Sequence, residues 1–315
     1  PHAEINALNA ARESVAGKTM VVTLEPCSHH GKTPPCVEAI KDAKIHKVTI
    51  GTLDPNPLVA GNGVRLLKEA GIDVEVLDTQ GAQDFLNADY LKKISTGKPY
   101  ITLKSAVSLD GKMALKNGDS QWITSDASRA EVQRMRRNAS AIMTGIGTIL
   151  ADDPRLTVHD AMEDSPIRII LDTYLKTPLD AGIVKTAPQV PTWIMTGETD
   201  TAKVEPYEKL GVRIIPVSIK DSHLDLNHVF DLLAQEPLKH ILIESGPTLT
   251  TSLLKEGWVD RWVLMMAPKL LGADAKSLVG PLNLFALKDA LSFTLKDQQR
   301  LGPDIALTLE LERNI

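Results

Sequence analysis

The stretch that decides the fold of this chain is Glu25-Pro26-Cys27-Ser28-His29-His30-Gly31-Lys32-Thr33-Pro34-Pro35-Cys36, together with Pro1-His2-Ala3-Glu4. It contains both cysteines of the chain, and the second segment adds one imidazole and one carboxylate. Catalytic zinc takes three protein ligands and leaves a fourth position for water. Cys27, Cys36 and His2 supply such a set. Glu4 can point into the same cavity as a base if it and His2 lie in the first turn of a helix.

Two other roles are open for the cysteines. Zinc can be fully enclosed, with His29 or His30 as a fourth ligand, but such a site has no use for Glu4. A disulfide between Cys27 and Cys36 is the other alternative. Two cysteines in 315 residues argue against a disulfide framework and for a reducing compartment, so we expect a cytoplasmic protein.

Composition limits the classes of function. The net charge is −5, aromatic residues make up 4% and no basic run is present, so the requirements for gripping a polynucleotide are poorly met. No apolar run approaches the roughly 20 residues that a membrane span needs. We therefore expect neither a nucleic-acid nor a membrane partner. Because a metal ligand stands at position two with no strand before it, we also expect that a further segment precedes Pro1.

Residues 1–97 have the pattern of a compact α/β layer domain. Apolar spacing predicts a helix over 3–16 that Gly17 terminates, and further helices over 35–40, 63–70 and 82–94. Buried strands are predicted over 20–24, 48–51 and 72–76. Alternating strands and helices favour a parallel or mixed sheet with helices on its faces. The metal-ligand segments would then open helices, where partial positive charge favours thiolate.

A break at 95–99 predicts a domain boundary, with a second domain over 98–315. Its predicted strands are 100–107, 141–145, 168–171, 192–195, 212–217, 240–243, 262–267 and 305–311, the last as an edge strand. Predicted helices cover 126–138 and 248–256, and another begins at Gly147. Gly145-x-Gly147 and Gly246-Pro247-Thr248 each lie at a strand-to-helix turn, where backbone amides can bind phosphate. Taken singly, a glycine at such a turn is more often only a tight bend.

His-x-Glu followed by Pro-Cys and a second cysteine is the pattern of zinc-dependent deaminases. The longer spacing here, with 28–35 between the cysteines, resembles the deaminase half of the bifunctional riboflavin-biosynthesis deaminase/reductase family, RibD. Lys104 and the segments 108–111, 120–124 and 150–154 resemble the family's reductase half, in the same order. The resemblance implies a cytidine-deaminase-like three-layer zinc domain followed by a dihydrofolate-reductase-like domain, with Zn²⁺ and NADPH as cofactors.

In the first domain the resemblance implies hydrolytic removal of an exocyclic amine from a pyrimidine. His2, Cys27 and Cys36 would hold the zinc, and Glu4 would carry protons from the activated water to the ring and to the leaving ammonia. Residues implied to contact the substrate are His29, Lys32, Asp54 and Asn56. The segment 54–57 is equally well explained as a plain turn, because its residue types make turns for local reasons.

In the second domain the resemblance implies that NADPH passes hydride to the anomeric carbon of a ring-opened ribosyl group. Lys104 and Glu244 would be the polar groups nearest this carbon, and which of them transfers a proton is open. Implied substrate neighbours are Ser120, Arg136, Leu156 and Glu244. Implied cofactor neighbours are Ala106, Trp122, Thr148, Asp152, Gly246, Pro247, Thr248, Leu249, Thr250, Thr251 and Ser252.

Two of these residues have simpler explanations. Arg136 forms a run with Arg134 and Arg137 on a predicted helix, which is usual for a solvated face, although a guanidinium group also matches phosphate in a bidentate fashion. Trp122 can equally be a core aromatic residue.

Two other classes of protein compete with this interpretation. One is a nucleoside or nucleic-acid deaminase fused to an unrelated binding module, and the charge balance and the insertion between the cysteines argue against it. The other is a structural zinc protein that merely binds a dinucleotide. We expect small phosphoribosylaminopyrimidine molecules as substrates and a homo-oligomer, either a dimer or a tetramer.

Overall fold

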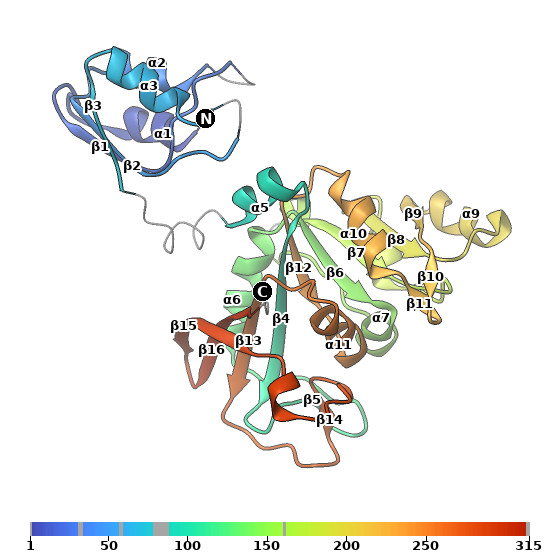
Figure 1. The fold of residues 1–315 in the computed structure, drawn as a ribbon. Helices are drawn as coiled ribbons and strands as arrows, with labels where there is room; N and C mark the ends of the chain where they lie inside the picture. The colour runs from blue at the N-terminus through green and yellow to red at the C-terminus, as the bar shows by residue number, and fades with distance from the viewer. Residues whose placement is uncertain (1, 31–33, 57–58, 78–87, 160–161, 313–315) are drawn as a thin grey trace. The chain divides into compact units, whose positions relative to one another are not determined.

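The computed structural model describes residues 2–30, 34–56, 59–77, 88–159 and 162–312. The chain divides into two compact units, Pro1–Gly97 and Lys98–Ile315. Each unit has its own sheet and its own buried apolar residues. Figure 1 labels their elements.

The first unit is built on a parallel sheet with the strand order β1-β2-β3. Its strands are β1 (Thr19–Leu24), β2 (Lys47–Thr52) and β3 (Asp73–Val76), and its helices are α1 (Ala3–Ala10), α2 (Cys36–Asp42), α3 (Asn62–Glu69) and α5 (Ala88–Thr96). Leu24 at the end of β1 is paired with Thr52 at the end of β2. The segments that follow these two strands therefore leave the sheet at the same edge, where ligands collect in α/β folds.

The apolar cluster of this unit holds α2 against the sheet. Val37 and Ile40 of α2 are fully buried together with Val48 and Ile50 of β2. Burying aliphatic side chains of this size contributes about 1.5–3 kcal/mol each. Because α2 is held in this way, its first residue, Cys36, has a fixed position at the edge of the sheet.

The helix predicted over 3–16 is wrong in its second half, because α1 ends at Ala10. Gly17 does not terminate a helix. It has a φ of 76° and follows a loop, and its N–H donates to the Lys44 carbonyl at 2.8 Å. Val15 still contacts the apolar cluster, but from the loop. Apolar spacing alone does not distinguish a helix face from a loop lying on the core. Of the helix predicted over 82–94, residues 82–87 lie outside the described residues, and α5 begins at Ala88.

The second unit is built on a large mixed sheet in the order β15-β16-β13-β4-β12-β6-β7-β8-β9. Its parallel strands are β4 (Tyr100–Ser108), β6 (Ala141–Gly145), β7 (Ile167–Leu171), β8 (Thr192–Thr196), β9 (Val212–Pro216), β12 (His240–Glu244) and β13 (Arg261–Ala267). Two antiparallel strands, β15 (Phe293–Leu301) and β16 (Asp304–Leu311), continue the sheet beyond β13.

Helices cover both faces of this sheet. They are α6 (Asp126–Arg137), α7 (Ile146–Asp152), α8 (Gly182–Lys185), α9 (Thr201–Lys209), α10 (Leu226–Ala234) and α11 (Pro247–Lys255). Smaller elements are β5 (Lys112–Ala114), β14 (Lys276–Ser277), β10 (Ile219–Lys220), β11 (His223–Leu224) and the short 3₁₀ helices η1 (Met162–Asp164) and η2 (Leu287–Asp289). Strand β5 pairs with β14, and β10 with β11.

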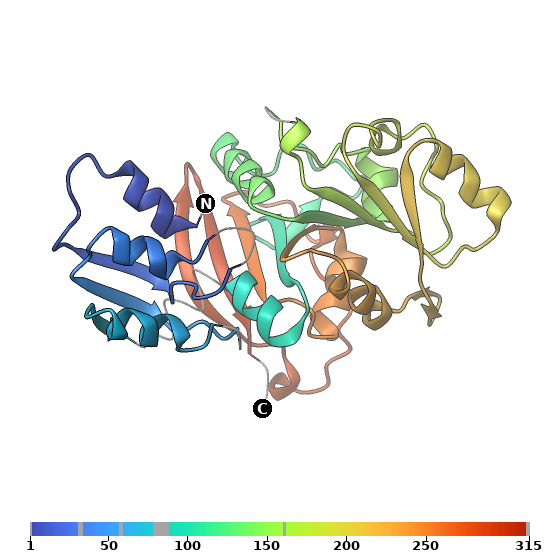
Figure 2. The ribbon, with the colours of Figure 1, turned by 90° about the horizontal axis from the view of Figure 1, so that it is seen from above.

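Neighbouring residues of one strand belong to different apolar clusters. Met143 of β6 contacts the cluster that α10 and α11 cover, whereas Ile142 contacts the cluster under α7, α8 and α9. Figure 2 shows α10 and α11 on one side of the sheet and α7 and α9 on the other. Strands buried on both faces are typical of parallel sheets. We therefore expect the polar functional groups of this unit at the ends of the strands and in the loops beyond them.

The prediction of 305–311 as an edge strand is wrong, because β16 lies between β13 and β15. The true edge strand on that side is β15, which the sequence analysis missed. Its middle residues, Lys296-Asp297-Gln298-Gln299-Arg300, are polar and exposed, so they lack the alternation that marks a half-buried strand. Pairing with β16 makes them a strand.

None of the helices in the described ranges combines the length and the apolar character that a bilayer span requires.

Candidate functional site

The first candidate site is a cluster of metal-binding groups in unit 1. Its members come from three segments, since His2 precedes α1, Cys27 follows β1 and Cys36 is the first residue of α2. His2 Nδ1 lies 3.5 Å from Cys27 Sγ and 3.3 Å from Cys36 Sγ. All three ligand atoms lie within 4.8 Å of one another. The fold therefore brings the predicted ligand set together.

These separations fit a tetrahedral zinc ion. With a Zn–S bond of about 2.3 Å and a Zn–N bond of about 2.0 Å, a tetrahedral angle separates sulfur from nitrogen by about 3.5 Å. The Cys36 N–H also donates to Cys27 Sγ at 3.2 Å, which fixes the two cysteines relative to each other. Both cysteines are free thiols, so the disulfide alternative is wrong. Among the described residues the cluster has three members, and neither His29 nor His30 completes a closed site.

Glu4 lies beside this cluster without belonging to it. It is half-buried in the first turn of α1. Burial and then the charge of Glu4 raise the pKa of the Cys36 thiol, so the carboxylate is close enough to that sulfur to act on it electrostatically. A bound dication would reverse this local effect, because it deprotonates a coordinating thiol outright. The arrangement places a carboxylate next to three side chains that could hold a metal ion.

Glu25 ties the metal segment to the rest of the sheet edge. It is 3% exposed, although it carries a carboxyl group. Its two oxygens accept hydrogen bonds from the backbone N–H groups of Asp54, Gly61 and Val64 at 3.2, 2.9 and 3.1 Å. Because Glu25 is two residues before Cys27, these bonds fix the cysteine relative to the segment after β2. The sequence analysis did not single out Glu25.

Asp54 and Asn56 lie in that segment, for which the sequence allows either a plain turn or a substrate site. The structure contains the local bond of such a turn. The Asn56 N–H donates to Asp54 Oδ1 at 2.9 Å, which is the local bond of an Asx turn. The Tyr90 hydroxyl also lies 3.0 Å from each Asp54 oxygen. Burial and the charge of Asp54 raise the pKa of Tyr90 to about 12. His29 is exposed, and Lys32 lies outside the described residues.

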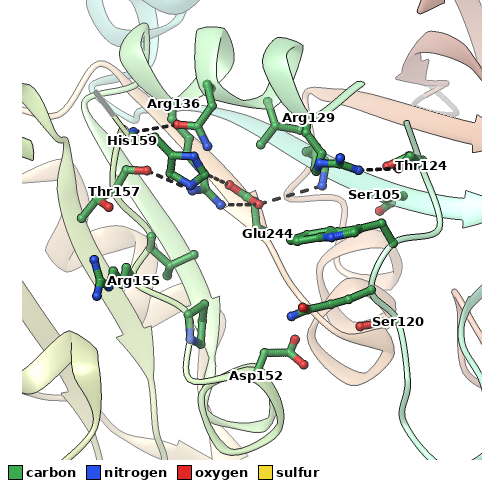
Figure 3. A pocket seen from close by; sticks show the side chains of 18 of the residues that line it. Ser105, Ser120, Thr124, Arg129, Arg136, Asp152, Arg155, Thr157, His159 and Glu244 are labelled. Carbon is green, nitrogen blue, oxygen red and sulfur yellow. Dashed lines mark hydrogen bonds and ion pairs between the residues drawn. The ribbon is translucent and has the colours of Figure 1, made fainter. Parts of the chain in front are cut away.

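The second candidate site is a cavity of about 930 Å³ in unit 2 (Figure 3). Its wall includes half of the predicted reductase residues, namely Lys104, Ala106, Ser120, Trp122, Arg136, Asp152, Leu156 and Glu244. They come from β4, the loop before α6, α6 itself, the end of α7 with the loop after it, and the end of β12. Burial raises the pKa of Asp152, and the charge of Lys276 opposes this shift.

The remaining predicted cofactor residues lie outside the wall of this cavity. Thr148 is in the first turn of α7, and 246–252 begin α11. The two helix starts are neighbours, since a Cβ at Gly246 would lie 4.0 Å from Thr148 Oγ1. Two hydroxyls of α11 are used within the protein: Thr250 Oγ1 is 3.0 Å from Ser245 Oγ, and Thr251 donates to the Pro247 carbonyl at 2.6 Å.

An ion-pair network lies in the wall of the cavity. Arg136 donates to both oxygens of Glu244, with Nε at 2.7 Å and Nη2 at 3.0 Å, and its Nη1 donates to the Thr157 carbonyl at 3.0 Å. Lys104 Nζ is 3.9 Å from Glu244 Oε2. The two residues are direct partners in the parallel pairing of β4 with β12. The side chain of Arg136 is 13% exposed, so the solvated-face explanation is wrong. Its fork is already occupied by a carboxylate, as Figure 3 shows.

Burial and charge act in opposite directions on these groups. Burial lowers the pKa of Lys104, and the Arg136 charge lowers it further, whereas Glu244 opposes both. Burial raises the pKa of Glu244, but the charges of Arg136 and Lys104 and the hydrogen bonds of Arg136 outweigh it, so the net shift is downward. The cavity therefore holds an ionised carboxylate beside an ammonium group that loses its proton more easily than usual.

Trp122 is an exposed wall residue. Its side chain is 62% exposed, so the core-aromatic explanation is wrong. The guanidinium of Arg129 lies over the indole ring, 4.6 Å from its centre. Arg129 Nη1 also donates to the Thr124 carbonyl at 2.9 Å. A large exposed aromatic ring at a cavity mouth is suited to contact a flat ligand.

Sequence reasoning missed several wall residues, among them Arg129, Gln133, Arg137, Arg155, Thr157 and His159. A signal was available for some of them, because 129, 133 and 137 are four residues apart and lie on one face of a helix. Arg155 precedes Leu156, whose φ is 50°, and His159 lies three residues after it. A leucine in this conformation is unusual, and such residues concentrate at ligand sites.

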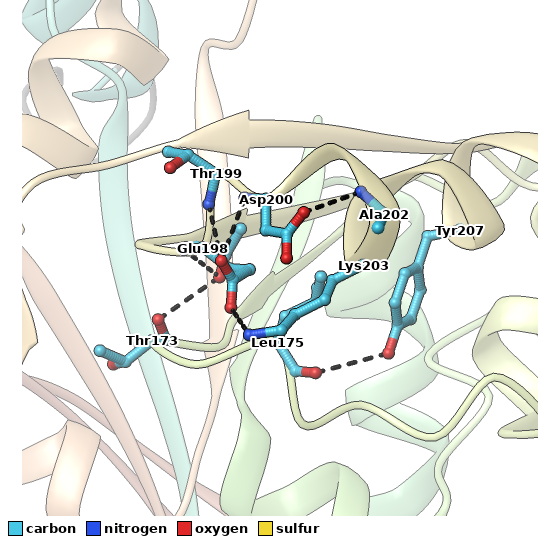
Figure 4. Close-up of polar contacts among 9 residues, drawn as sticks. Thr173, Leu175, Glu198, Thr199, Asp200, Ala202, Lys203 and Tyr207 are labelled. Atoms are coloured by element: carbon cyan, nitrogen blue, oxygen red, sulfur yellow. Dashed lines mark hydrogen bonds and ion pairs between the residues drawn. The ribbon is translucent and has the colours of Figure 1, made fainter.

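A third polar cluster lies at the end of β8 and the start of α9 (Figure 4). Glu198 accepts hydrogen bonds from the N–H groups of Thr199 and Asp200, each at 3.1 Å, and from Lys203. Asp200 in turn caps α9 by accepting from the Ala202 N–H at 3.0 Å. These charged groups bind one another, which gives them a structural role at the start of the helix.

The two sites define the chain as a zinc-dependent deaminase unit joined to an α/β reductase unit. Family models agree with this division: the cytidine and deoxycytidylate deaminase zinc-binding region matches residues 1–52, and the RibD C-terminal domain matches residues 99–307. The chain belongs to the RibD family of bifunctional riboflavin-biosynthesis deaminase/reductases.

Similar proteins cover nearly the whole chain. The riboflavin biosynthesis protein RibD of Aquifex aeolicus is 40% identical over 308 residues, which are 98% of this chain and 84% of that protein. The structure of Acinetobacter baumannii RibD, form 1, covers 99% of this chain and 86% of its own at 39% identity, with a TM-score of 0.84. A Thermotoga maritima diaminohydroxyphosphoribosylaminopyrimidine deaminase/5-amino-6-(5-phosphoribosylamino)uracil reductase covers 99% and 85% at 29% identity, with a TM-score of 0.82. The enzyme is thus both a hydrolase and an oxidoreductase, and its cofactors are Zn²⁺ and NADPH.

Proposed function

We propose that unit 1 deaminates a phosphoribosylaminopyrimidine and that the cavity of unit 2 reduces the deaminated product. Both substrates are small molecules. The observation that carries the first assignment is the three-ligand cluster of His2, Cys27 and Cys36 with Glu4 beside it. The observation that carries the second is the Arg136–Glu244–Lys104 network in the cavity wall.

In the deaminase site, His2, Cys27 and Cys36 would hold zinc. When bound, zinc supplies Lewis-acid activation of a water molecule. The Glu4 carboxylate accepts the proton of that water, delivers a proton to the ring nitrogen and assists ammonia as it leaves. Oxygen from water thus replaces the exocyclic amine on the ring carbon. The thiols must stay reduced to bind metal, which favours a cytoplasmic location.

The test of this assignment is Glu4→Gln, measured as ammonia release and zinc content of the same preparation. We expect zinc to remain bound and ammonia release to fall by about 10²–10⁴-fold, the usual contribution of a general acid–base group. Glu38→Gln is the matched control, because Glu38 is also in the first turn of a helix but pairs with Lys41 on the surface. If the Glu4 variant loses zinc or keeps its activity, Glu4 is not the base. His29, Lys32, Asp54 and Asn56 are proposed as substrate contacts at the same sheet edge.

In the reductase site, NADPH supplies the hydride when bound. Lys104 is the proposed proton donor, because burial makes its ammonium group more acidic than usual. Glu244, kept ionised by Arg136 and Lys104, is suited to accept hydrogen bonds from sugar hydroxyls. In the ring-opened substrate the anomeric carbon is doubly bonded to the exocyclic nitrogen. Lys104 would deliver a proton to this nitrogen as hydride reaches the carbon, so the C=N bond becomes a C–N bond and the ribosyl group becomes a ribityl chain that stays attached to the pyrimidine.

Arg136 acts on the substrate through Glu244, because its fork is occupied. The substrate phosphate is then left to exposed nitrogen-bearing side chains of the cavity wall, of which Arg155 and His159 are two. Ser120 and Leu156 are proposed as further substrate contacts. For NADPH we propose Ala106, Trp122, Thr148, Asp152 and 246–252. The adjacent starts of α7 and α11 support this, since helix N-termini favour phosphate.

The reductase assignment is tested with Lys104→Met, following NADPH oxidation and ammonia release separately. We expect NADPH oxidation to be lost while ammonia release continues, because the two sites lie in separate units. Loss of both activities, with the variant still folded, would contradict the assignment of one reaction to each unit.

A further inference from the structure

The cavity wall contains a segment, 120–125, that has little packing of its own. Trp122 is 62% exposed, and the only buried hydrophobic residue of the segment is Ile123. The segment holds its shape through polar contacts instead. One is internal, where the Ile123 N–H donates to the Ser120 carbonyl at 3.2 Å. Others come from nearby residues such as Arg129, and from residues far away in the sequence, of which Lys269 and Asp304 are two.

Lys269 holds the segment at Trp122. Its ammonium group donates to the Trp122 carbonyl at 2.9 Å, across 147 positions of the sequence. The backbone of Lys269 is itself fixed, since its N–H donates to the Ala267 carbonyl at 2.8 Å and its carbonyl accepts from the Leu109 N–H at 2.8 Å. Ala267 is the last residue of β13, in the middle of the sheet. Lys269 thus connects the exposed Trp122 turn to a rigid strand.

Asp304 holds the other end of the segment. It is 1% exposed and accepts from the Ser125 N–H at 2.7 Å and from the Ser128 hydroxyl at 2.6 Å. Burial raises the pKa of Asp304, but its hydrogen bonds from Ser128 and Ser125 and the nearby charge of Lys269 lower it by more. Ser125 also caps α6. The Asp304 end is therefore buried and integrated into the fold, whereas the Trp122 end is exposed and is held by Lys269 at its carbonyl and by Arg129 over its indole.

We propose that Lys269 is a positioning residue of the reductase site, which holds the Trp122 indole in the cavity wall through the Trp122 carbonyl. Lys269 does not line the cavity and touches no reacting atom, so it acts through Trp122 alone. The proposal rests on the proposed function in one respect, namely that Trp122 borders NADPH. Arg129 of α6 also contacts the segment, since it stacks on the indole and donates to the Thr124 carbonyl, so Lys269 is a second anchor that holds the Trp122 carbonyl from the β13 side.

The experiment compares Lys269→Met, Lys269→Arg and Lys288→Met with the full-length wild-type enzyme. Methionine keeps the length of the side chain and removes the donor, arginine retains a donor, and Lys288 is an exposed lysine on η2 that serves as the control. Acrylamide quenching reports the exposure of Trp122, because Trp193 and Trp262 are 7% and 6% exposed and a Trp122→Phe variant defines the Trp122 signal. Acrylamide is neutral, so the change of charge does not affect it.

We expect Lys269→Met to change the quenching constant of Trp122 and to raise the KM for NADPH by about 3–10-fold, which corresponds to the net contribution of one ordinary hydrogen bond. The kcat of NADPH oxidation should stay near the wild-type value, ammonia release should be unchanged, and Lys269→Arg should restore most of the affinity. Unchanged quenching and KM would overturn the proposal. So would a loss of folding, since that would make Lys269 a structural residue.

This experiment distinguishes a failure of the proposed NADPH site from a failure of the proposed role of Lys269. If the wild-type enzyme fails to bind NADPH, the proposed function of the cavity fails, while the quenching measurement still tests the contact of Lys269 with the Trp122 segment. If NADPH binds equally well to wild type and Lys269→Met, the cavity keeps its proposed function and Lys269 loses its role.

Discussion

Removal of Arg136 should leave a buried, unpaired carboxylate and destabilise unit 2. In Arg136→Met, Glu244 loses two charge-assisted hydrogen bonds of 2.7 and 3.0 Å and keeps only Lys104 at 3.9 Å. The side chains of Arg136 and Glu244 are 13% and 14% exposed, so water can replace little of what is lost. Breaking a buried pair by removing one partner costs about 3–5 kcal/mol. We expect the free energy of unfolding to fall by that amount at neutral pH.

The assay is urea unfolding followed by tryptophan fluorescence, which reports this unit alone because all four tryptophans lie within 98–315. Arg134→Met is the matched control on the same helix. Arg134 pairs with Glu131, but its side chain is 65% exposed, so its loss should cost about 0–1 kcal/mol. A double variant that also carries Glu244→Gln should recover part of the stability, because it removes the unpaired charge.

The pH dependence gives a second test of the same argument. The folded-state pKa of Glu244 is lowered in the wild type, so its ionisation stabilises the fold above the unfolded-state pKa, and that stability is lost as the pH falls through the folded-state pKa. The difference between wild type and Arg136→Met should therefore be largest at neutral pH and shrink in acid. A cost no larger than that of Arg134→Met, or one independent of pH, would refute the reasoning.

Three further predictions concern single positions. Gly63→Ala should destabilise unit 1 and weaken zinc binding, because the new Cβ would collide with the Pro26 carbonyl next to Cys27. Thermal unfolding measures the loss of stability, and zinc titration measures the loss of affinity. At Gly147 a Cβ meets nothing within 4 Å, so Gly147→Ala should keep the unit folded, yet raise the KM for NADPH if phosphate binds there. Tyr90→Phe removes the hydroxyl that contacts Asp54, which should cost about 0.5–1.5 kcal/mol in urea unfolding and abolish the phenol titration near pH 12.

The candidate metal ligands could be proposed from sequence because each lies at the end of an element that short-range rules reveal. His2 and Glu4 are two positions apart at the start of a helix, and Cys36 opens another helix that apolar periodicity reveals. The same rules failed at 11–16, where apolar spacing belongs to a loop lying on the core. They also failed for β15, whose polar residues become a strand only by pairing with β16.

The reductase cavity shows where local rules end. The sequence alone marks Arg136 as one of three arginines on a helix and Glu244 as the residue that follows a strand predicted over 240–243. Only the tertiary structure joins them, across 108 positions, and thereby decides that Arg136 binds a carboxylate and not the solvent. The same holds for Lys269 and Trp122, which meet across 147 positions. Residue types and spacing determine which chemistry is possible, but pairing between distant segments depends on how the sheet is ordered, and no local pattern contains that information.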